Sequence, residues 1–498
     1  MQCAHTVCAS RCVLEHRFIS RPRAYDRLRV LIASTKERSI GIPGISALSD
    51  NEPKGIGTSV EDWLSAIGER NVHVGVIGLG YVGLPLAVAA LRSGFRVTGF
   101  DVNESHVERL AAGQSSIGRV TGEEVMEFCQ SGCFRPTTQW DDMRGCDAVI
   151  ICVPTPLDKH REPDLSYVEG TSRLIAGTLR PGQLVVLEST TYPGTTTGVV
   201  RPILEETGLS SGRDFFLAFS PEREDPGNQQ FETSTIAKIV GGDGPEATEV
   251  ATALYGAIVR KVVPVSSSEV AEATKLMENI FRAVNIALVN ELKIIYGRMG
   301  IDIWEVIEAA KTKPFGYMPF YPGPGLGGHC IPIDPFYLTW KAREFDVSTR
   351  FIELAGEVNT RAPYHVIESL VEALSTRKQK AVAGSRILLF GLAYKKNVED
   401  VRESPAFTLI KLLEERGAKV DFHDPFVPEV PMTREHMELA GRRSVNFDPA
   451  VLQSYDAGLI CTDHSNVDYA GIVASMDLVI DTRNATKDII DRSNVVLA

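Results

Sequence analysis

Cys330 stands among residues that favour neither helix nor strand. The segment 322–334 around it contains four glycines and three prolines, a composition that predicts an irregular loop close to a ligand. A single cysteine in a protein is most often an inert apolar residue of the core. Here the neighbours are glycine, histidine and proline instead of a periodic apolar stripe, which favours a nucleophile. Asp334, four residues later, could order a water molecule or share a proton beside it.

A glycine-rich segment, residues 78–83, is the second chemical signal. A β-branched run at 72–77 precedes it, an apolar helical stretch at 84–91 follows it, and a second strand-like run ends at Asp101. This order of strand, turn, helix, strand and acid is typical of a Rossmann-like unit, which seats a dinucleotide pyrophosphate on a helix N-terminus. A lone glycine pattern would be weak evidence, but the full context makes a purely structural unit the lesser alternative.

The glycines of this segment have separate tasks. Gly78 allows the tight turn, Gly80 the close approach of the backbone to the pyrophosphate, and Gly83 the close packing of helix on strand. Asp101 would accept hydrogen bonds from the adenosine ribose and repel a 2′-phosphate. The predicted cofactor is therefore NAD rather than NADP.

Length, charge and cysteine use restrict the class of protein. A chain of 498 residues with 44% hydrophobic residues can form two or three domains. A net charge of −12 disfavours a nucleic-acid partner, and no apolar run is long enough to predict a membrane span. Nine cysteines without regular spacing predict free thiols in a reducing compartment, so we expect a cytoplasmic protein. The cysteines within 129–152 lack the histidines or paired spacing of a zinc site, and no metal is predicted.

Residues 1–70 differ from the rest of the chain. Within 1–38, eight arginines and lysines stand against three acids, and no sustained apolar stretch marks a secretory signal. A mitochondrial transit peptide, a disordered extension and a start codon assigned too early all remain open, and we expect a poorly ordered extension. Residues 58–64 predict a short capped helix that leads into the first strand.

Three apolar runs beyond Asp101 predict buried parallel strands, and a polar, proline-containing loop follows each of them. The strands are 147–153, 183–187 and 215–219, and their loops are 154–156, 188–195 and 220–227. Because the carboxyl ends of parallel strands share one sheet edge, these loops predict a ligand site at that edge.

A long amphipathic helix is predicted over 269–298, of the kind that links domains or packs against a second subunit. Lys275 and Asn279 are four residues apart and share one face of it. From Gly384 a further set of strands begins, without a glycine fingerprint, which predicts a second Rossmann-like domain that binds something other than a full dinucleotide. Its strands are predicted at 385–393, 419–425, 457–462 and 478–483.

The predicted fold class is α/β, with two Rossmann-like domains joined by a long central helix and a helical dimerisation domain. The expected domains are the N-terminal extension 1–70, the NAD-binding domain 71–265, the central helical domain 266–380 with the cysteine loop, and the second Rossmann-like domain 381–498.

Several motifs in order resemble the UDP-glucose/GDP-mannose dehydrogenase family, and the resemblance covers roughly residues 70–498. They are Gly78-Leu79-Gly80-Tyr81-Val82-Gly83-Leu84-Pro85, Ser220-Pro221-Glu222-Arg223, Gly325-Leu326-Gly327-Gly328-His329-Cys330 with Asp334, Tyr394-Lys395-Lys396-Asn397, and Arg402-Glu403-Ser404-Pro405. The runs 188–195, 222–228 and 311–334 look most like the bacterial UDP-N-acetylglucosamine 6-dehydrogenase branch.

This resemblance implies a four-electron oxidation of a sugar C6 alcohol to a carboxylate with two NAD, for surface polysaccharide synthesis. Cys330 would trap the intermediate aldehyde as a thiohemiacetal, which becomes a thioester that water cleaves. Lys275 and Asn279 would contact the C6 oxygen, Asp334 and Thr190 would hold the water, and Glu222 would act as general acid and base.

The glycine-rich turn and the resemblance together imply two sets of ligand contacts. The cofactor set is Gly78, Gly80, Tyr81, Val82, Gly83, Asp101, Thr155, Thr190 and Arg402. The substrate set is Glu222, Lys275, Asn279, Gly327, Tyr394, Lys395 and Arg483. The resemblance also implies that the domain 381–498 is the UDP-sugar-binding domain. The implied partners are a UDP-sugar and a second copy of the chain, in a homodimer or a larger homo-oligomer.

Two departures from the UDP-glucose branch favour an N-acetyl sugar. Pro226 stands where that branch has a second glutamate, and no clear counterpart of a cross-subunit arginine lies near Lys311 or Lys313. UDP-N-acetylmannosamine, UDP-glucose and GDP-mannose remain as alternative substrates. A two-electron dehydrogenase of the β-hydroxyacid type and a non-enzymatic scaffold remain as other classes, although both leave Cys330 without a task.

Overall fold

The computed structural model describes residues 55–498 apart from 116, 118–119, 159, 224–233, 329 and 434–435, and the side chain of Cys330 also lies outside this description. Most of the predicted N-terminal extension therefore lies outside the described residues. Within the described ranges, no helix is long and apolar enough to cross a membrane.

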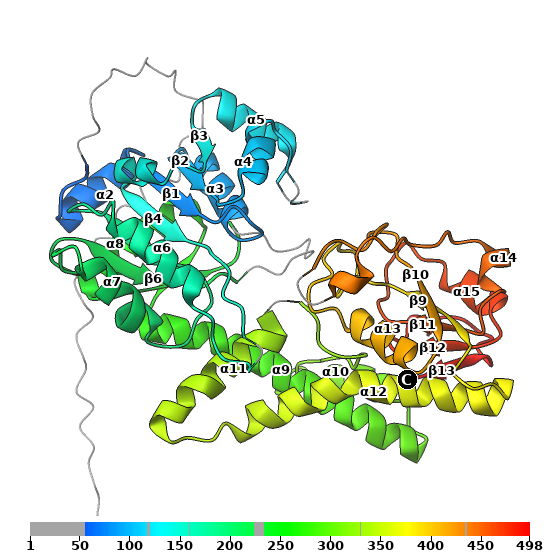
Figure 1. Ribbon diagram of the computed structural model, residues 1–498. Helices are drawn as coiled ribbons and strands as arrows, with labels where there is room; N and C mark the ends of the chain where they lie inside the picture. Colours follow the sequence, from blue (N-terminus) through cyan, green and yellow to red (C-terminus); the bar gives the residue numbers. More distant parts are fainter. Residues whose placement is uncertain are drawn as a thin grey trace, which may run out of the picture. The chain divides into compact units, whose positions relative to one another are not determined.

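An eight-stranded sheet occupies the first half of the described chain, with the strand order β3-β2-β1-β4-β5-β6-β7-β8 (Figure 1). Its strands are β1 His73–Ile77, β2 Arg96–Phe100, β3 Phe134–Thr137, β4 Ala148–Ile151, β5 Leu184–Leu187, β6 Phe216–Phe219, β7 Lys238–Gly242 and β8 Val262–Pro264. All neighbours run parallel except β6 and β7. Strand order reverses at β1, which lies between β2 and β4, and open α/β sheets bind ligands at such a point.

Helices cover both faces of this sheet because its central strands are apolar throughout. They are α2 Val60–Gly68, α3 Gly83–Arg92, α4 Glu104–Ala111, α5 Gly122–Gln130, α6 Ser166–Ala176, α7 Arg201–Glu205 and α8 Pro245–Ile258, with the short turns η1 Trp140–Gly145 and η2 Thr196–Val200. The strands predicted at 72–77, 95–100, 147–153, 183–187 and 215–219 are all present.

Helix α2 corrects the expectation that residues up to 70 are poorly ordered. Its N-cap Ser59 accepts a hydrogen bond from the Asp62 amide, as the capped-helix prediction required. Trp63 is fully buried in the core of the first sheet, and its indole donates a hydrogen bond to the Gly182 carbonyl at 2.9 Å. The burial of one large aromatic residue ties this short helix to the sheet.

Two long helices, α9 Ser268–Met299 and α12 Arg350–Lys378, lie side by side in the centre of the chain (Figure 1). Asn359 of α12 joins them, since its amide donates to the Ala283 carbonyl at 3.0 Å and its carbonyl accepts from Asn290 at 3.1 Å. The prediction of a helix over 269–298 is confirmed within one residue at each end. The smaller helices here are α10 Ile303–Lys311, α11 Cys330–Ala342 and the turn η3 Arg343–Phe345.

The loop predicted at 322–334 is confirmed only as far as Gly328. Gly325 and Gly328 have φ angles of 142° and 82°, which a helix does not allow. From Cys330 onward the chain is helical, contrary to the prediction, because Pro332 falls in the first turn, where no amide donor is needed. Cys330 is thus the first residue of α11, and Asp334 follows one turn later.

A five-stranded parallel sheet with the order β10-β9-β11-β12-β13 forms the last part of the chain. The strands are β9 Arg386–Phe390, β10 Lys419–His423, β11 Ala457–Ile460, β12 Val479–Asp481 and β13 Val495–Leu497. Its helices are α13 Pro405–Glu415, α14 Pro449–Leu452 and α15 Tyr469–Ser475, with the turn η4 Met437–Leu439. The structure is therefore an α/β protein with two Rossmann-like sheets and central helices, as predicted.

Candidate functional site

The turn between β1 and α3 requires glycine at two of its three predicted positions. A Cβ atom on Gly78, whose φ is 90°, would lie 2.6 Å from the Cys152 carbonyl oxygen. A Cβ atom on Gly83 would lie 1.9 Å from the Gly78 carbonyl oxygen, so this glycine lets the helix start close to the turn. A Cβ on Gly80 would meet no atom within 4 Å, so this position faces open space. The turn thus fits a dinucleotide, with the approach of a pyrophosphate at Gly80.

Asp101 follows the last residue of β2 and lies against this turn. Its Oδ2 accepts a hydrogen bond from the Leu79 amide at 3.0 Å, and its Oδ1 accepts from the Asn103 amide at 2.9 Å. These two bonds hold a negative charge beside the turn, in agreement with a ribose-binding carboxylate.

Arg402 lies beside the cofactor turn, although more than three hundred residues separate them in the sequence. Its guanidinium lies 4.7 Å from the centre of the Tyr81 ring. Asp400 holds the same guanidinium, with Nη2 to Oδ2 at 2.7 Å and Nε to Oδ1 at 3.0 Å. The structure thus brings two residues of the predicted cofactor set together, Tyr81 and Arg402.

Four of the predicted catalytic residues meet on one side of α9. The Lys275 ammonium donates a hydrogen bond to the main-chain oxygen of Glu222 at 2.5 Å. One turn later, Nδ2 of Asn279 donates to Oδ2 of Asp334 at 2.6 Å. Lys275, Asn279 and Asp334 are all buried. A lysine, an amide and a carboxylate are therefore held within one helical turn of each other, next to the start of α11.

Asp334 is 1% exposed, and burial raises the pKa of its carboxyl group to about 6, although the Lys275 charge and the Asn279 hydrogen bond act in the opposite direction. A carboxyl group with this pKa changes its charge in the range where enzymes commonly work.

The loop that carries Thr190 is anchored to α9 by Glu272. This buried carboxylate accepts hydrogen bonds from the Gly194 amide at 2.5 Å, the Thr196 amide at 2.9 Å and the Thr196 hydroxyl at 2.7 Å. Burial raises the pKa of Glu272 to about 7, against the effect of these hydrogen bonds. Thr190 itself follows β5 and is partly exposed, and Thr155 follows β4, where its carbonyl accepts a hydrogen bond from Tyr337 of α11 at 2.6 Å.

The glycine loop before α11 packs against the segment that carries the predicted substrate residues. A Cβ atom on Gly327 would lie 2.7 Å from the Cβ of Tyr394, and the Gly328 amide donates to the Arg402 carbonyl at 3.1 Å. A Cβ on Gly323 would lie 2.6 Å from Nη1 of Arg483. Glycine at these positions therefore lets the loop lie directly on Tyr394 and Arg483. Lys395, the other predicted substrate residue of this segment, is partly exposed.

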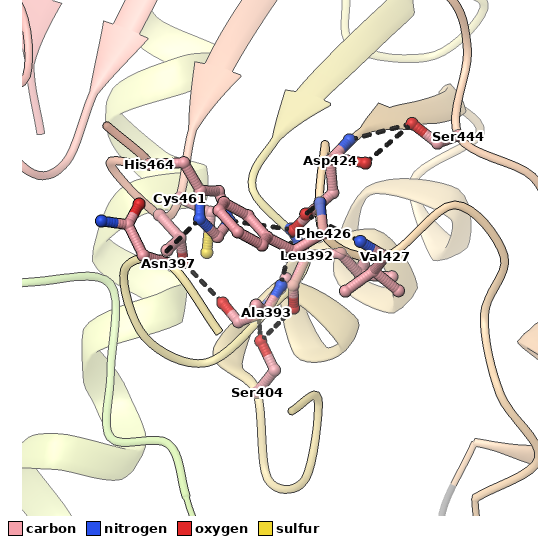
Figure 2. A network of polar contacts seen from close by, with 12 residues as sticks. Leu392, Ala393, Asn397, Ser404, Asp424, Phe426, Val427, Ser444, Cys461 and His464 are labelled. Carbon is pink, nitrogen blue, oxygen red and sulfur yellow. Dashed lines mark hydrogen bonds and ion pairs between the residues drawn. The ribbon is translucent and has the colours of Figure 1, made fainter. Parts of the chain in front are cut away.

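A buried pair, Asp424 and His464, supports the segment that begins at Leu392 (Figure 2). Asp424 Oδ2 accepts hydrogen bonds from the Leu392 amide at 2.6 Å, the Ala393 amide at 2.9 Å and His464 Nε2 at 3.0 Å. The Asn397 amide donates to His464 Nδ1 at 3.0 Å. Because a backbone amide can only donate, Nδ1 carries no proton and the imidazole is the neutral Nε2–H form.

Sequence reasoning did not assign this pair, although it predicted both a strand at 419–425, which includes Asp424, and the motif at Tyr394. An acid directly after a parallel strand was the available signal, since Asp101 occupies the same position after β2. It also missed Lys238 of β7, whose ammonium lies 3.1 Å from the Glu222 carboxylate. In the part of the chain that the structure describes, no group of three or more His, Cys, Asp or Glu residues could hold a metal ion.

Three family models match the chain in succession. All describe the UDP-glucose/GDP-mannose dehydrogenase family: its NAD binding domain matches residues 72–259, its central domain 269–361 and its UDP binding domain 388–488.

Two relatives with similar sequences are named for N-acetylated nucleotide sugars. The chain is 40% identical over 360 residues to a UDP-N-acetyl-D-glucosamine 6-dehydrogenase of Pseudomonas aeruginosa, an alignment that covers 72% of this chain and 84% of that protein. It is 35% identical over 423 residues to a UDP-N-acetyl-D-mannosamine dehydrogenase of Pyrococcus horikoshii, with 84% and 96% covered. The solved structure of UDP-D-ManNAc dehydrogenase from Pyrococcus horikoshii matches with a TM-score of 0.76 at 34% identity, and covers 84% of this chain and 96% of that chain.

Proposed function

Because the chain belongs to the UDP-glucose/GDP-mannose dehydrogenase family and is an NAD-dependent nucleotide-sugar dehydrogenase, we propose that it oxidises C6 of UDP-N-acetylglucosamine to a carboxylate. The observation that carries the chemistry is the buried cluster of Lys275, Asn279 and Asp334 beside Glu222. The choice of sugar rests on the runs 188–195, 222–228 and 311–334 and on the activity named for the Pseudomonas relative.

The proposed oxidation removes four electrons and passes through a thioester on Cys330. NAD accepts a hydride in each of the two oxidations. After the first, the Cys330 thiol adds to the C6 aldehyde and forms a thiohemiacetal. The second oxidation turns this adduct into a thioester, and water then breaks its carbon–sulfur bond, which yields the carboxylate and restores the thiol.

Lys275 and Asn279 would handle the C6 oxygen. An ammonium group has three donor hydrogens, and the Glu222 carbonyl takes one from Lys275, so others remain for a developing alkoxide or oxyanion. Asn279 likewise has a second amide hydrogen beside the one given to Asp334. Because both side chains are buried, this stabilisation would act with little screening by water.

Asp334, Thr190 and Glu222 would manage the water that cleaves the thioester. Asn279 occupies Oδ2 of Asp334, which leaves Oδ1 to accept a hydrogen bond from a water molecule. The Glu222 carboxylate would remove the proton from this water and return one to the leaving thiolate. Its main chain is held by Lys275, so the acid–base group and the oxyanion donor are fixed to each other.

The two sheets would divide the remaining binding between them. All but one of the predicted NAD contacts lie in the domain of the first sheet, and the exception is Arg402. These contacts are Gly78, Gly80, Tyr81, Val82, Gly83, Asp101, Thr155, Thr190 and Arg402. The UDP-sugar would lie on Tyr394, Lys395 and Arg483 and on the loop at Gly327, which packs on Tyr394. Cations such as Arg483 suit a diphosphate.

We also propose that the protein forms a homodimer or larger homo-oligomer through α9. It would act in the cytoplasm and supply a uronic acid for surface polysaccharide synthesis. Support for the assembly comes from large apolar side chains that α9 exposes, including Met277 at 68% and Leu288 at 53%. Light scattering of the purified protein tests this point, and a monomeric mass would contradict it.

The sugar is tested by assays with UDP-GlcNAc, UDP-GalNAc, UDP-ManNAc, UDP-glucose and GDP-mannose, with NADH counted per sugar consumed. The proposal requires the highest kcat/KM with UDP-GlcNAc and two NADH per sugar. UDP-ManNAc is the second candidate, because the Pyrococcus protein named for it aligns over more of this chain than the Pseudomonas relative does. One NADH per sugar would indicate a two-electron dehydrogenase, and none with any sugar would indicate a non-enzymatic scaffold.

A further inference from the structure

A buried lysine, Lys238 of β7, lies between two carboxylates next to the reaction site. Its ammonium lies 2.6 Å from Oε2 of Glu188 and 3.1 Å from Oε2 of Glu222. Lys238 and Glu188 are almost completely buried, and the Glu222 side chain is 14% exposed. One cation is therefore shared between a buried carboxylate and the proposed acid–base group.

Tyr255 of α8 contacts both Glu188 and Lys238. Its hydroxyl donates a short hydrogen bond to Oε1 of Glu188, and the Lys238 ammonium lies 5.4 Å from the centre of its ring. Both oxygens of Glu188 are thus occupied, one by the lysine and one by the tyrosine. The Glu188 side chain is fully buried.

Burial and charge compete within the cluster. Burial raises the pKa of Glu188, although Lys238 acts against this effect. Burial also works against the charged form of Lys238, but the carboxylates of Glu188 and Glu222 outweigh it and raise the pKa of the lysine. Lys238 therefore keeps its positive charge at neutral pH beside these two carboxyl groups.

We propose that Lys238 is a positioning residue that holds the Glu222 carboxylate through an ion pair, and that Glu188 limits the strength of this pair by sharing the same ammonium. The inference rests on the proposed role of Glu222 in thioester hydrolysis. If Lys238 formed an ion pair with Glu222 alone, the strong pair would make the Glu222 carboxylate a weak base. Because Lys238 pairs with Glu188 as well, Glu222 stays basic enough to take a proton from water.

Other groups that face Glu222 have different tasks. The Arg223 amide donates to Oε1 of Glu222 at 2.6 Å, while the Arg223 guanidinium is bound to Glu278 of α9 at 2.5 Å. Lys275 donates to the main-chain oxygen of Glu222. Cys152, after β4, also lies near the three charges, and burial raises its thiol pKa well above the usual value, so it stays neutral.

The test uses two substitutions that change the charge near Glu222 in opposite directions. Glu188→Gln keeps the shape of the side chain but removes the competing carboxylate, so Lys238 acts on Glu222 alone. The pH limb of thioester hydrolysis is the range in which its rate falls because Glu222 becomes protonated. Its midpoint should move to lower pH by about one unit or more. Lys238→Met removes the cation and leaves Glu222 near a second carboxylate, so the same limb should move up by a similar amount.

The readout is single-turnover kinetics of the full-length protein, with NADH formation and uronic acid release followed separately over a pH range. Both substitutions should change acid release, while the first hydride transfer keeps its wild-type rate within about twofold. Unchanged pH limbs in Glu188→Gln, or shifts in the same direction in both variants, would overturn the inference. Glu414→Gln is a matched control, since Glu414 pairs with Arg442 at 2.6 Å in the second sheet domain and should leave the profile unchanged.

Lys238→Met leaves Glu188 buried without its cation and could prevent folding. The double substitution Lys238→Met with Glu188→Gln removes both charges, and its limb should fall between those of the two single variants. If the double variant instead matched Glu188→Gln, Lys238 would have no influence on Glu222. Failure of the proposed function is distinguishable, because the wild-type protein would then form no uronic acid from any of the sugars.

Discussion

The amide of Asn279 donates a hydrogen bond to Oδ2 of Asp334 at 2.6 Å, and so joins the central helix α9 to the helix that starts at Cys330. Both residues are buried, so this bond is not exposed to competition from bulk water. The contact places Asn279, and with it Lys275 one turn earlier, beside the first turns of α11.

Asp334 leads to a prediction about pH. Its pKa of about 6 means that the carboxylate is the main form above pH 6 and the neutral acid below it. If ionised Asp334 holds the water, acid release should fall about tenfold for each pH unit below this value. Asp334→Asn should abolish the limb near pH 6, leave the separate limb assigned to Glu222 in place, and lower acid release at least about a hundredfold, while NAD still binds. Stopped-flow measurement of the two steps checks this prediction, and a limb near pH 6 that survives in Asp334→Asn would assign that limb to a group other than Asp334.

Cys330 is tested by replacement with serine. Cys330→Ser should lose net production of uronic acid and still bind NAD, because an oxygen ester forms and hydrolyses less readily than a thioester in this role. Mass spectrometry of the products and cofactor titration measure the two properties. Full acid production by this variant would exclude the covalent mechanism.

Asp101 predicts the choice of cofactor. Its carboxylate, held by the Leu79 amide, would repel a 2′-phosphate, so kcat/KM with NADP should be at least about tenfold below that with NAD. Asp101→Ser should narrow this ratio by raising the activity with NADP. Equal turnover of the wild-type protein with both cofactors would contradict the assignment of Asp101 to the ribose.

Replacement of Arg483 tests whether the second sheet domain binds the UDP-sugar while the first binds NAD. Arg483→Ala should raise KM for the UDP-sugar about tenfold or more, with little effect on KM for NAD. Arg402→Ala is the natural counterpart, since its guanidinium lies beside Tyr81 of the cofactor turn and its loss should affect KM for NAD instead. The reverse pattern would mean that the two binding sites are assigned to the wrong sheets.

The Asp424–His464 pair predicts a coupling between stability and substrate affinity (Figure 2). Asp424→Asn would turn an amide group toward backbone donors such as those of Leu392 and Phe426, so the free energy of unfolding should fall by about 2–4 kcal/mol. KM for the UDP-sugar should rise, because Tyr394 and Lys395 directly follow Leu392 and Ala393, whose amides Asp424 holds. Asp448→Asn, which changes an exposed N-cap of α14, should cost at most about 1 kcal/mol and leave KM unchanged. Urea denaturation and steady-state kinetics measure both quantities.

The sequence by itself determined the parts of the protein that depend on neighbours in the chain. The glycine turn at 78–83, the apolar strands around it and α9 were all predicted, because tight turns, buried strands and amphipathic helices leave periodic or steric patterns within a few residues. The family and the cofactor followed from these motifs. The same local reasoning did not anticipate α11, because a glycine- and proline-rich segment contains a helix start only if its prolines fall in the first turns.

Tertiary structure alone decided which charges share a site. Strand β7 was missed because it carries Lys238, a charge that argues against a buried strand when read locally. The partners that make this burial tolerable, Glu222 and Glu188, are 16 and 50 residues away in the sequence. Asp424 and His464 are likewise 40 residues apart. Electrostatic neutralisation of a buried group depends on distance in space, and no pattern along the chain records which distant residue supplies it.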